Sequence, residues 1–180
     1  MKKHGFLLLA LAFALATSCT RKGGAQAETT AQGEESINTV HSLPEYEYCD
    51  SLTTGTHKTV YRISSRPDES LPVVVDEDGV KYVDNRFQLT VTRDGSTLFS
   101  RSFTRADFRD LLPGEFREYG IMDGLRFNRA EDGKLYFNAC VSYPDSDMSC
   151  PFILTVGPDG SHAIEPDPAV DEEDEEFPSI

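Results

Sequence analysis

The clearest pattern in the chain is an alternation of apolar and polar residues on both sides of an Asp-Gly pair. In FQLTVTRDGSTLFSRSF (87–103), Phe87, Leu89 and Val91 fall on one face of a predicted strand, and polar residues fall on the other. Asp-Gly favours tight hairpin turns because both residues tolerate positive φ. The same strand–turn–strand pattern surrounds three more Asp-Gly pairs, at residues 78–79, 132–133 and 159–160. Such alternation predicts an antiparallel sheet with one buried face.

The stretch after residue 133 repeats this pattern. One predicted strand face carries Leu135, Phe137, Ala139, Val141 and Tyr143. A fifth Asp-Gly pair, at 123–124, lacks the flanking alternation of the other four. The segment LTVTRDGS (89–96) also echoes LTVGPDGS (154–161), which fits either an internal duplication or shared turn chemistry.

One helical signal interrupts the strands. Thr104 to Asp107 has the form of a capping box with Asp in place of Glu; FRDLL follows it, and Pro113-Gly114 ends it. A second short helix is predicted over residues 115–119, before Gly120. The expected apolar stripe consists of Phe108, Leu111 and Leu112. We therefore predict a mainly β fold of about eight or nine antiparallel strands, a sandwich or a partly open barrel, with a short helical insertion. An α+β fold is the alternative.

The N-terminus has a different pattern. Basic residues are followed by thirteen uncharged, mostly apolar residues from Gly5 to Thr17, fewer than the roughly 20 that a membrane-spanning helix needs. This arrangement is typical of a secretory signal peptide. A buried N-terminal helix is the alternative, but the run has no amphipathic pattern. We therefore predict that residues 1–18 are a signal peptide.

The residues Ala16-Thr17-Ser18-Cys19 resemble a lipobox, the cleavage motif of bacterial lipoproteins. Ala16 stands where leucine is usual, and cleavage at a small-x-small site is the alternative. Under the lipobox interpretation, Cys19 is the first mature residue and carries the lipid. Each buried CH₂ contributes about 0.8 kcal/mol, so two or three acyl chains anchor a protein stably. The predicted partner is thus a membrane, reached through the lipid on Cys19.

The composition of the rest of the chain indicates three segments. Residues 19–45 have few large apolar side chains and are predicted to be a flexible tether. Residues 46–166 are the predicted β domain. Residues 167–180 continue a run that holds eight acids and no base between Glu165 and Glu176, and we predict a disordered acidic tail.

The charge of the chain excludes one class of partner. Without residues 1–18 the chain keeps 15 basic and 31 acidic residues, a net charge of −16. Such a protein is repelled by nucleic acid and by anionic lipid headgroups. We expect no nucleic-acid partner.

Three cysteines remain beyond Cys19. Cys140 and Cys150 flank a predicted hairpin with Pro144 to Ser146 at its tip, and this hairpin would place the two cysteines directly opposite each other. Directly opposed residues are close enough for a disulfide at a non-hydrogen-bonded pair. A register shift of one residue would place Val141 opposite Cys150 and forbid the bond. Cys49 would stay free.

The sequence offers no catalytic motif. It contains no Gly-x-Ser-x-Gly, no phosphate-binding glycine loop and no His-Glu-x-x-His. The acidic clusters at 76–78 and 145–147 lack calcium-loop spacing, so we expect no metal or cofactor and assign no catalytic residue. Seven phenylalanines could line a ligand cavity, but we expect them to form the core: Phe99, Phe103, Phe108, Phe116, Phe127, Phe137 and Phe152.

The middle of the chain resembles a family of Bacteroidetes lipoproteins of unknown function. The resemblance covers residues 70–157 and rests on three stretches: VVVDEDGVKYVDNRFQLTVTRDGSTLFSRSFTRADFRD, FREYGIMDGLRF and GKLYFNACVSYPDSD. It implies a lipid-anchored protein of the bacterial cell envelope and carries over no catalytic residues. Basic rather than acidic residues follow Cys19, which favours an outer-membrane anchor that faces the periplasm.

These observations predict a non-enzymatic binding or structural domain whose protein or small-molecule ligand is not specified by the sequence. An envelope hydrolase or a carbohydrate-binding accessory protein is the alternative.

Overall fold

A computed structural model describes residues 39–168 of the chain. Within this range, eleven strands form three sheets, and two short helical segments lie between β7 and β8. No helix within residues 39–168 is both long and apolar enough to cross a membrane. The strands are β1 (Val40–His41), β2 (Tyr46–Thr54), β3 (His57–Pro67), β4 (Val74–Val75), β5 (Lys81–Tyr82), β6 (Asn85–Arg93), β7 (Ser96–Phe103), β8 (Ile121–Glu131), β9 (Lys134–Ser142), β10 (Ser149–Val156) and β11 (His162–Pro166). The helical segments are η1 (Arg105–Phe108), a 3₁₀ helix, and α2 (Gly114–Tyr119).

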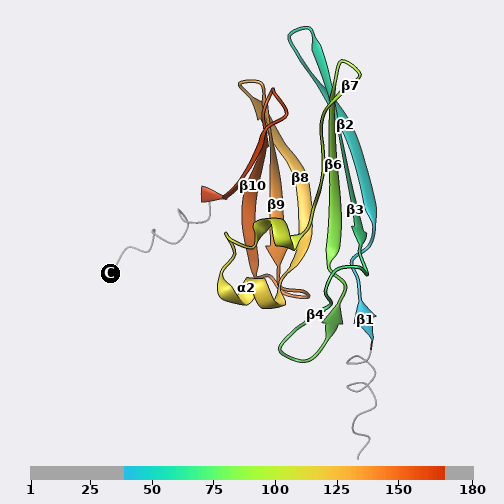
Figure 1. Cartoon of the computed structure of the whole chain (residues 1–180), viewed down its shortest axis with the longest axis vertical. Helices are drawn as coiled ribbons and strands as arrows, with labels where there is room; N and C mark the ends of the chain where they lie inside the picture. Colours follow the sequence, from blue (N-terminus) through green and yellow to red (C-terminus); the bar gives the residue numbers. More distant parts are fainter. Residues whose placement is uncertain (1–38, 169–180) are drawn as a thin grey trace, which may run out of the picture. The chain divides into compact units, whose positions relative to one another are not determined.

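Two four-stranded antiparallel sheets make up most of the domain (Figure 1). Their strand orders are β2-β3-β6-β7 and β11-β10-β9-β8. The inward side chains of both sheets form one hydrophobic core. Tyr61 of β3, for example, stacks on Phe127 of β8 with ring centroids 4.5 Å apart and meets Phe137 of β9 edge-on at 5.9 Å. The predicted mainly β, antiparallel fold is confirmed, with eleven strands in residues 39–168 where about eight or nine were predicted.

The alternation in the sequence accounts for which side chains form this core. Phe87, Leu89 and Val91 are fully buried, whereas the residues between them face outward and are only half-buried. Burying each such side chain stabilises the fold by about 1.5–3 kcal/mol. Six of the seven phenylalanines singled out above are buried, as expected for core residues, and Phe127 is half-buried at the edge of the core.

The four flanked Asp-Gly pairs all lie in turns between paired strands, as predicted. At Asp94-Gly95 both residues have positive φ, 51° and 84°, which is the backbone of a tight hairpin turn. The fifth pair, Asp123-Gly124, lies inside β8, where the register shifts between Met122 and Gly124. The pair without flanking alternation thus marks an irregularity in a strand.

The helical insertion has the predicted position but less helix than predicted. The Thr104 amide donates to the Asp107 carboxylate at 2.9 Å, which confirms the capping box. However, η1 spans only four residues, Arg105–Phe108, and the rest of FRDLL continues it as turns rather than as helix. The predicted apolar stripe is wrong at one position: Phe108 and Leu112 are buried, but Leu111 is 40% exposed.

A third, small sheet has the order β1-β5-β4. β1 pairs in parallel with β5, and Leu43 packs against a second small core that includes Val74, Tyr82 and Ile121. Residues 40–43 are therefore part of the folded domain, and the predicted tether boundary at residue 45 is too late. The predicted signal peptide, Cys19, most of the predicted tether and the acidic residues beyond 168 lie outside the described residues.

Candidate functional site

The structure separates the two cysteines that were predicted to face each other. Cys150 lies opposite Val141, and Cys140 lies opposite Pro151. Directly opposed residues share a face of the sheet, and successive residues alternate between faces. Cys150 therefore packs against the core, while Cys140 lies on the outer face. The predicted register is wrong by one residue. The loop between β9 and β10 spans residues 143–148, an even number, whereas a pairing of Cys140 with Cys150 requires an odd number.

The three cysteines among the described residues are free thiols. Burial is the main cause that raises the pKa of both Cys140 and Cys150, which keeps these thiols protonated and weakly reactive. Cys49 is exposed on β2. Cys19, the predicted lipidation site, lies outside the described residues.

His57 and the acidic cluster at 76–78 make hydrogen bonds that stabilise turns. The His57 Nδ1 atom lies 2.6 Å from Asp94 Oδ2, and the Asp94 carboxylate also accepts from the Lys58 amide. Asp76 accepts backbone hydrogen bonds within its own turn, from Asp78 at 3.0 Å and Val80 at 2.8 Å. Among residues 39–168 no group of three or more His, Cys, Asp or Glu side chains is placed to hold a metal ion.

A cleft of about 600 Å³ lies between the edges of the two main sheets. We call it the tyrosine cleft. Its wall on one side comes from β2 and β3, and its wall on the other side comes from β8. β2 and β8 are both edge strands, so neither has a strand neighbour on its outer side. The cleft is lined by Tyr46, Glu47, Tyr48, Asp50, Tyr61, Ile63, Leu125, Arg126 and Phe127.

A row of aromatic rings runs across the cleft. Tyr48 and Tyr61 lie on adjacent strands with ring centroids 6.1 Å apart, and Tyr61 stacks on Phe127 at 4.5 Å. The Tyr46 hydroxyl donates to the Leu125 carbonyl at 3.1 Å, a hydrogen bond that joins β2 to β8. Tyr48 is 49% exposed, which is unusual for a ring that continues a buried aromatic stack.

Polar groups surround these rings. The Tyr48 hydroxyl donates to Asp50 Oδ2 at 3.1 Å. The guanidinium of Arg126 makes no hydrogen bond or ion pair within residues 39–168, so it is available to a ligand. Burial raises the pKa of Tyr46 and of Tyr61 above the usual value, with Asp50 and Tyr48 adding to the effect at Tyr61. Both hydroxyls therefore stay neutral at physiological pH.

This cleft was not predicted from the sequence. Its signal was present as the pair Tyr46 and Tyr48, two residues apart and so on one face of β2. Whether these tyrosines lie beside residues of β8, about 80 positions later in the chain, depends on how the two sheets stack. Of the phenylalanines considered as cavity residues, only Phe127 reaches this cleft.

Comparison with known proteins identifies a family for this chain. No curated protein matches the sequence. A family model described as a domain of unknown function, DUF4738, matches residues 26–164. The match starts before β1, covers β2 to β10 and the first three residues of β11, and includes every residue of the tyrosine cleft. The chain therefore belongs to the DUF4738 family.

Proposed function

We propose that the protein is lipid-anchored in the bacterial cell envelope and that its β domain binds a saccharide in the tyrosine cleft without cleaving it. The observation that carries the proposal is the partly exposed aromatic row of Tyr48, Tyr61 and Phe127 beside Asp50 and Arg126. Sugar rings present an apolar face that stacks on aromatic rings, and their hydroxyls need hydrogen-bond partners at the rim. The cleft volume of about 600 Å³ also lies within the range of small-ligand sites.

The carboxylates of the cleft favour binding over hydrolysis. Glycoside hydrolysis commonly uses two carboxyl groups that flank the scissile bond. Glu47 and Asp50 are the two acidic residues of the cleft lining, and they are separated by three positions on one strand. Their side chains consequently point to opposite faces of β2, and Glu47 is paired with Arg62 outside the cleft. Of these two carboxylates, only Asp50 lies on the face of β2 that carries Tyr46 and Tyr48.

Titration with soluble saccharides tests the binding site. Cello-, malto- and chitooligosaccharides are added to the full chain, and backbone amide NMR signals are followed. We expect saturable shifts in β2, β3 and β8 for one class of saccharide. Tyr48→Ala should weaken this binding at least tenfold, and Tyr48→Phe should keep most of it because the ring remains.

Tyr136→Ala is the matched control, because Tyr136 lies on the outer face of β9, away from the cleft. It should leave the affinity unchanged. The proposal fails if none of the saccharides gives saturable shifts, or if Tyr136→Ala weakens binding as much as Tyr48→Ala.

The lipid anchor has its own test, since Cys19 lies outside the described residues. Cells that express the protein are labelled metabolically with palmitate. The wild type should take up label, and Cys19→Ala should not. Equal labelling of both proteins would contradict the anchor and leave the cleft proposal standing.

A further inference from the structure

A second pocket, separate from the tyrosine cleft, lies beside the helical insertion. Its volume is about 210 Å³. Leu71 and Leu112 contribute apolar walls, and Asp84 is the single acidic residue of the lining. Three arginines line the same pocket: Arg105, Arg109 and Arg117. Such a cluster is notable in a chain whose net charge is −14.

Arg105 is fixed in the wall of this pocket. Its guanidinium donates to the carbonyls of Glu118 at 3.2 Å and Gly120 at 2.6 Å, and it lies 3.5 Å from Asp84. Asp84 is held in turn by the amide of Met122 at 2.9 Å. The side chains of Arg105 and Asp84 are 17% and 5% exposed. This ion pair therefore neutralises the charge of Arg105 and holds its side chain in a fixed position in the pocket wall.

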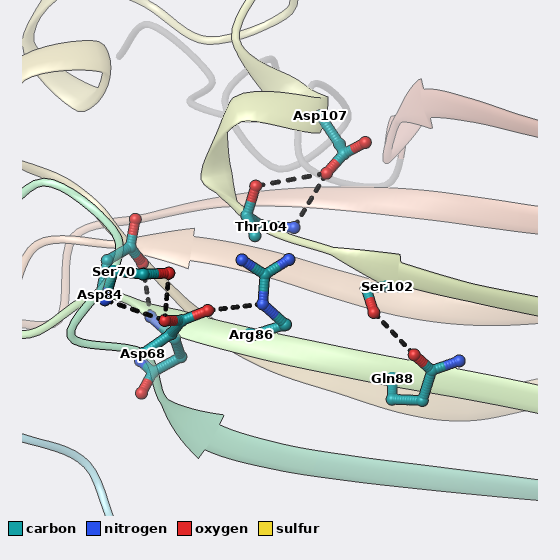
Figure 2. Close-up of polar contacts among 9 residues, drawn as sticks. Asp68, Ser70, Asp84, Arg86, Gln88, Ser102, Thr104 and Asp107 are labelled. Atoms are coloured by element: carbon teal, nitrogen blue, oxygen red, sulfur yellow. Dashed lines mark hydrogen bonds and ion pairs between the residues drawn. The ribbon is translucent and has the colours of Figure 1, made fainter.

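The guanidinium groups of Arg109 and Arg117 have no such partner. Neither makes a hydrogen bond or ion pair with any of the residues 39–168. Nearby arginines differ in this respect. Arg86, for example, donates to Asp68 at 2.5 Å, and Ser70 donates to the same carboxylate (Figure 2). The pocket thus keeps two uncompensated positive charges.

The chemistry of these groups selects the ligand. A guanidinium presents a planar fork of N–H donors that matches phosphate oxygens in pairs. The volume of about 210 Å³ is below the range typical of whole small-molecule ligands, so it admits a headgroup with a short apolar part. The acidic charge of the whole chain opposes loosely bound anions, and binding must therefore come from the local geometry.

We propose that the pocket between the helical insertion and residues 71–84 binds a phosphate group, held by Arg109 and Arg117 with Arg105 as a positioning residue. The phosphate can belong to a soluble phosphate ester or to a phospholipid headgroup. The site is independent of the tyrosine cleft, since the two share no lining residue.

The test is an NMR titration of the full chain with inorganic phosphate at constant ionic strength. We expect saturable shifts in the amides of residues 104–118. The double variant Arg109→Gln/Arg117→Gln should bind phosphate at least tenfold more weakly. Both side chains are exposed and unpaired in residues 39–168, so this variant should keep the wild-type spectrum elsewhere.

Arg66→Gln is the matched control. Arg66 is also exposed and has no side-chain partner within residues 39–168, but it lies outside the pocket. Its loss should leave phosphate binding unchanged. The absence of saturable shifts in the wild type, or equal weakening by Arg66→Gln, would overturn the proposal.

A second arm distinguishes the two sources of phosphate. Co-sedimentation is measured with phosphatidylglycerol vesicles, with phosphatidylcholine vesicles as the reference, for a Cys19→Ala chain that carries no lipid of its own. Selective sedimentation with phosphatidylglycerol that the double variant loses assigns the site to a lipid headgroup. Saturable binding of inorganic phosphate without vesicle binding assigns it to a soluble ester.

Discussion

The turn between β10 and β11 provides the sharpest test of how the two main sheets pack. Gly160 has a φ of +81°, and a Cβ atom at this position would lie 2.6 Å from the Leu98 carbonyl oxygen of β7. Gly95, in the turn between β6 and β7, has a nearly equal φ of +84°, but a Cβ there would meet no atom within 4 Å. The two glycines follow Asp in similar segments of sequence. They differ because the backbone of β7 lies against Gly160, whereas no other strand within residues 39–168 lies against Gly95.

The two alanine substitutions therefore separate backbone strain from steric clash. Positive φ costs a residue with a Cβ about 1–2 kcal/mol, and the reduced freedom of the unfolded chain offsets part of that cost. Gly95→Ala should thus destabilise by about 1 kcal/mol. Gly160→Ala adds the displacement of backbone against backbone, at about 1–3 kcal/mol. Its total should be about 2–4 kcal/mol.

Thermal and urea unfolding of both variants, followed by circular dichroism, measure this difference. For a domain of this size 1 kcal/mol corresponds to roughly 3–5 °C in Tm. Gly95→Ala should lower the Tm by about 4 °C and Gly160→Ala by about 10 °C, with unchanged urea m-values. Equal losses for the two variants would refute the close approach of the β10–β11 turn to β7.

Three further predictions concern other parts of the domain. Phe137 is fully buried against both sheets, so Phe137→Ala should cost about 3–5 kcal/mol in urea unfolding, and a loss below about 1 kcal/mol would contradict the shared core. Hydrogen bonds from Ser70 and Arg86 lower the pKa of Asp68 from 3.8 to about 2, so its stabilising effect is present above pH 3.8 and lost as the pH falls through 2. Asp68→Asn should therefore lower the Tm at pH 7, with a difference that disappears near pH 2; a pH-independent difference would rule out the ionised carboxylate as its source. Because Cys140 and Cys150 lie on opposite faces, non-reducing mass spectrometry should find no peptide that links them, and a linked peptide would disprove the observed register.

Local sequence determined the hairpins of this domain. Asp-Gly pairs set the turns, and apolar alternation set the buried face, because both signals act between residues that are near in the chain. The strand β2 was harder to predict. Its side chains are mostly exposed, and its sequence lacks the apolar alternation of β6 or β9. The length of the loop between β9 and β10 was likewise set by how the two strands pair, and the loop residues themselves did not indicate it.

The candidate sites depend on contacts that the sequence does not encode locally. The tyrosine cleft joins Tyr48 to Phe127, and the pocket beside the helical insertion joins Arg105 and Arg117 to Asp84. Patterns of period two specify which face a side chain occupies, but not which other face will cover it. The covering face is determined when the two sheets stack, because their packing depends on the complementary shapes of many side chains at once. The sequence by itself thus determined the strands, most turns and the buried faces, whereas only the tertiary structure decided which surfaces stayed open and which charged groups stayed unpaired.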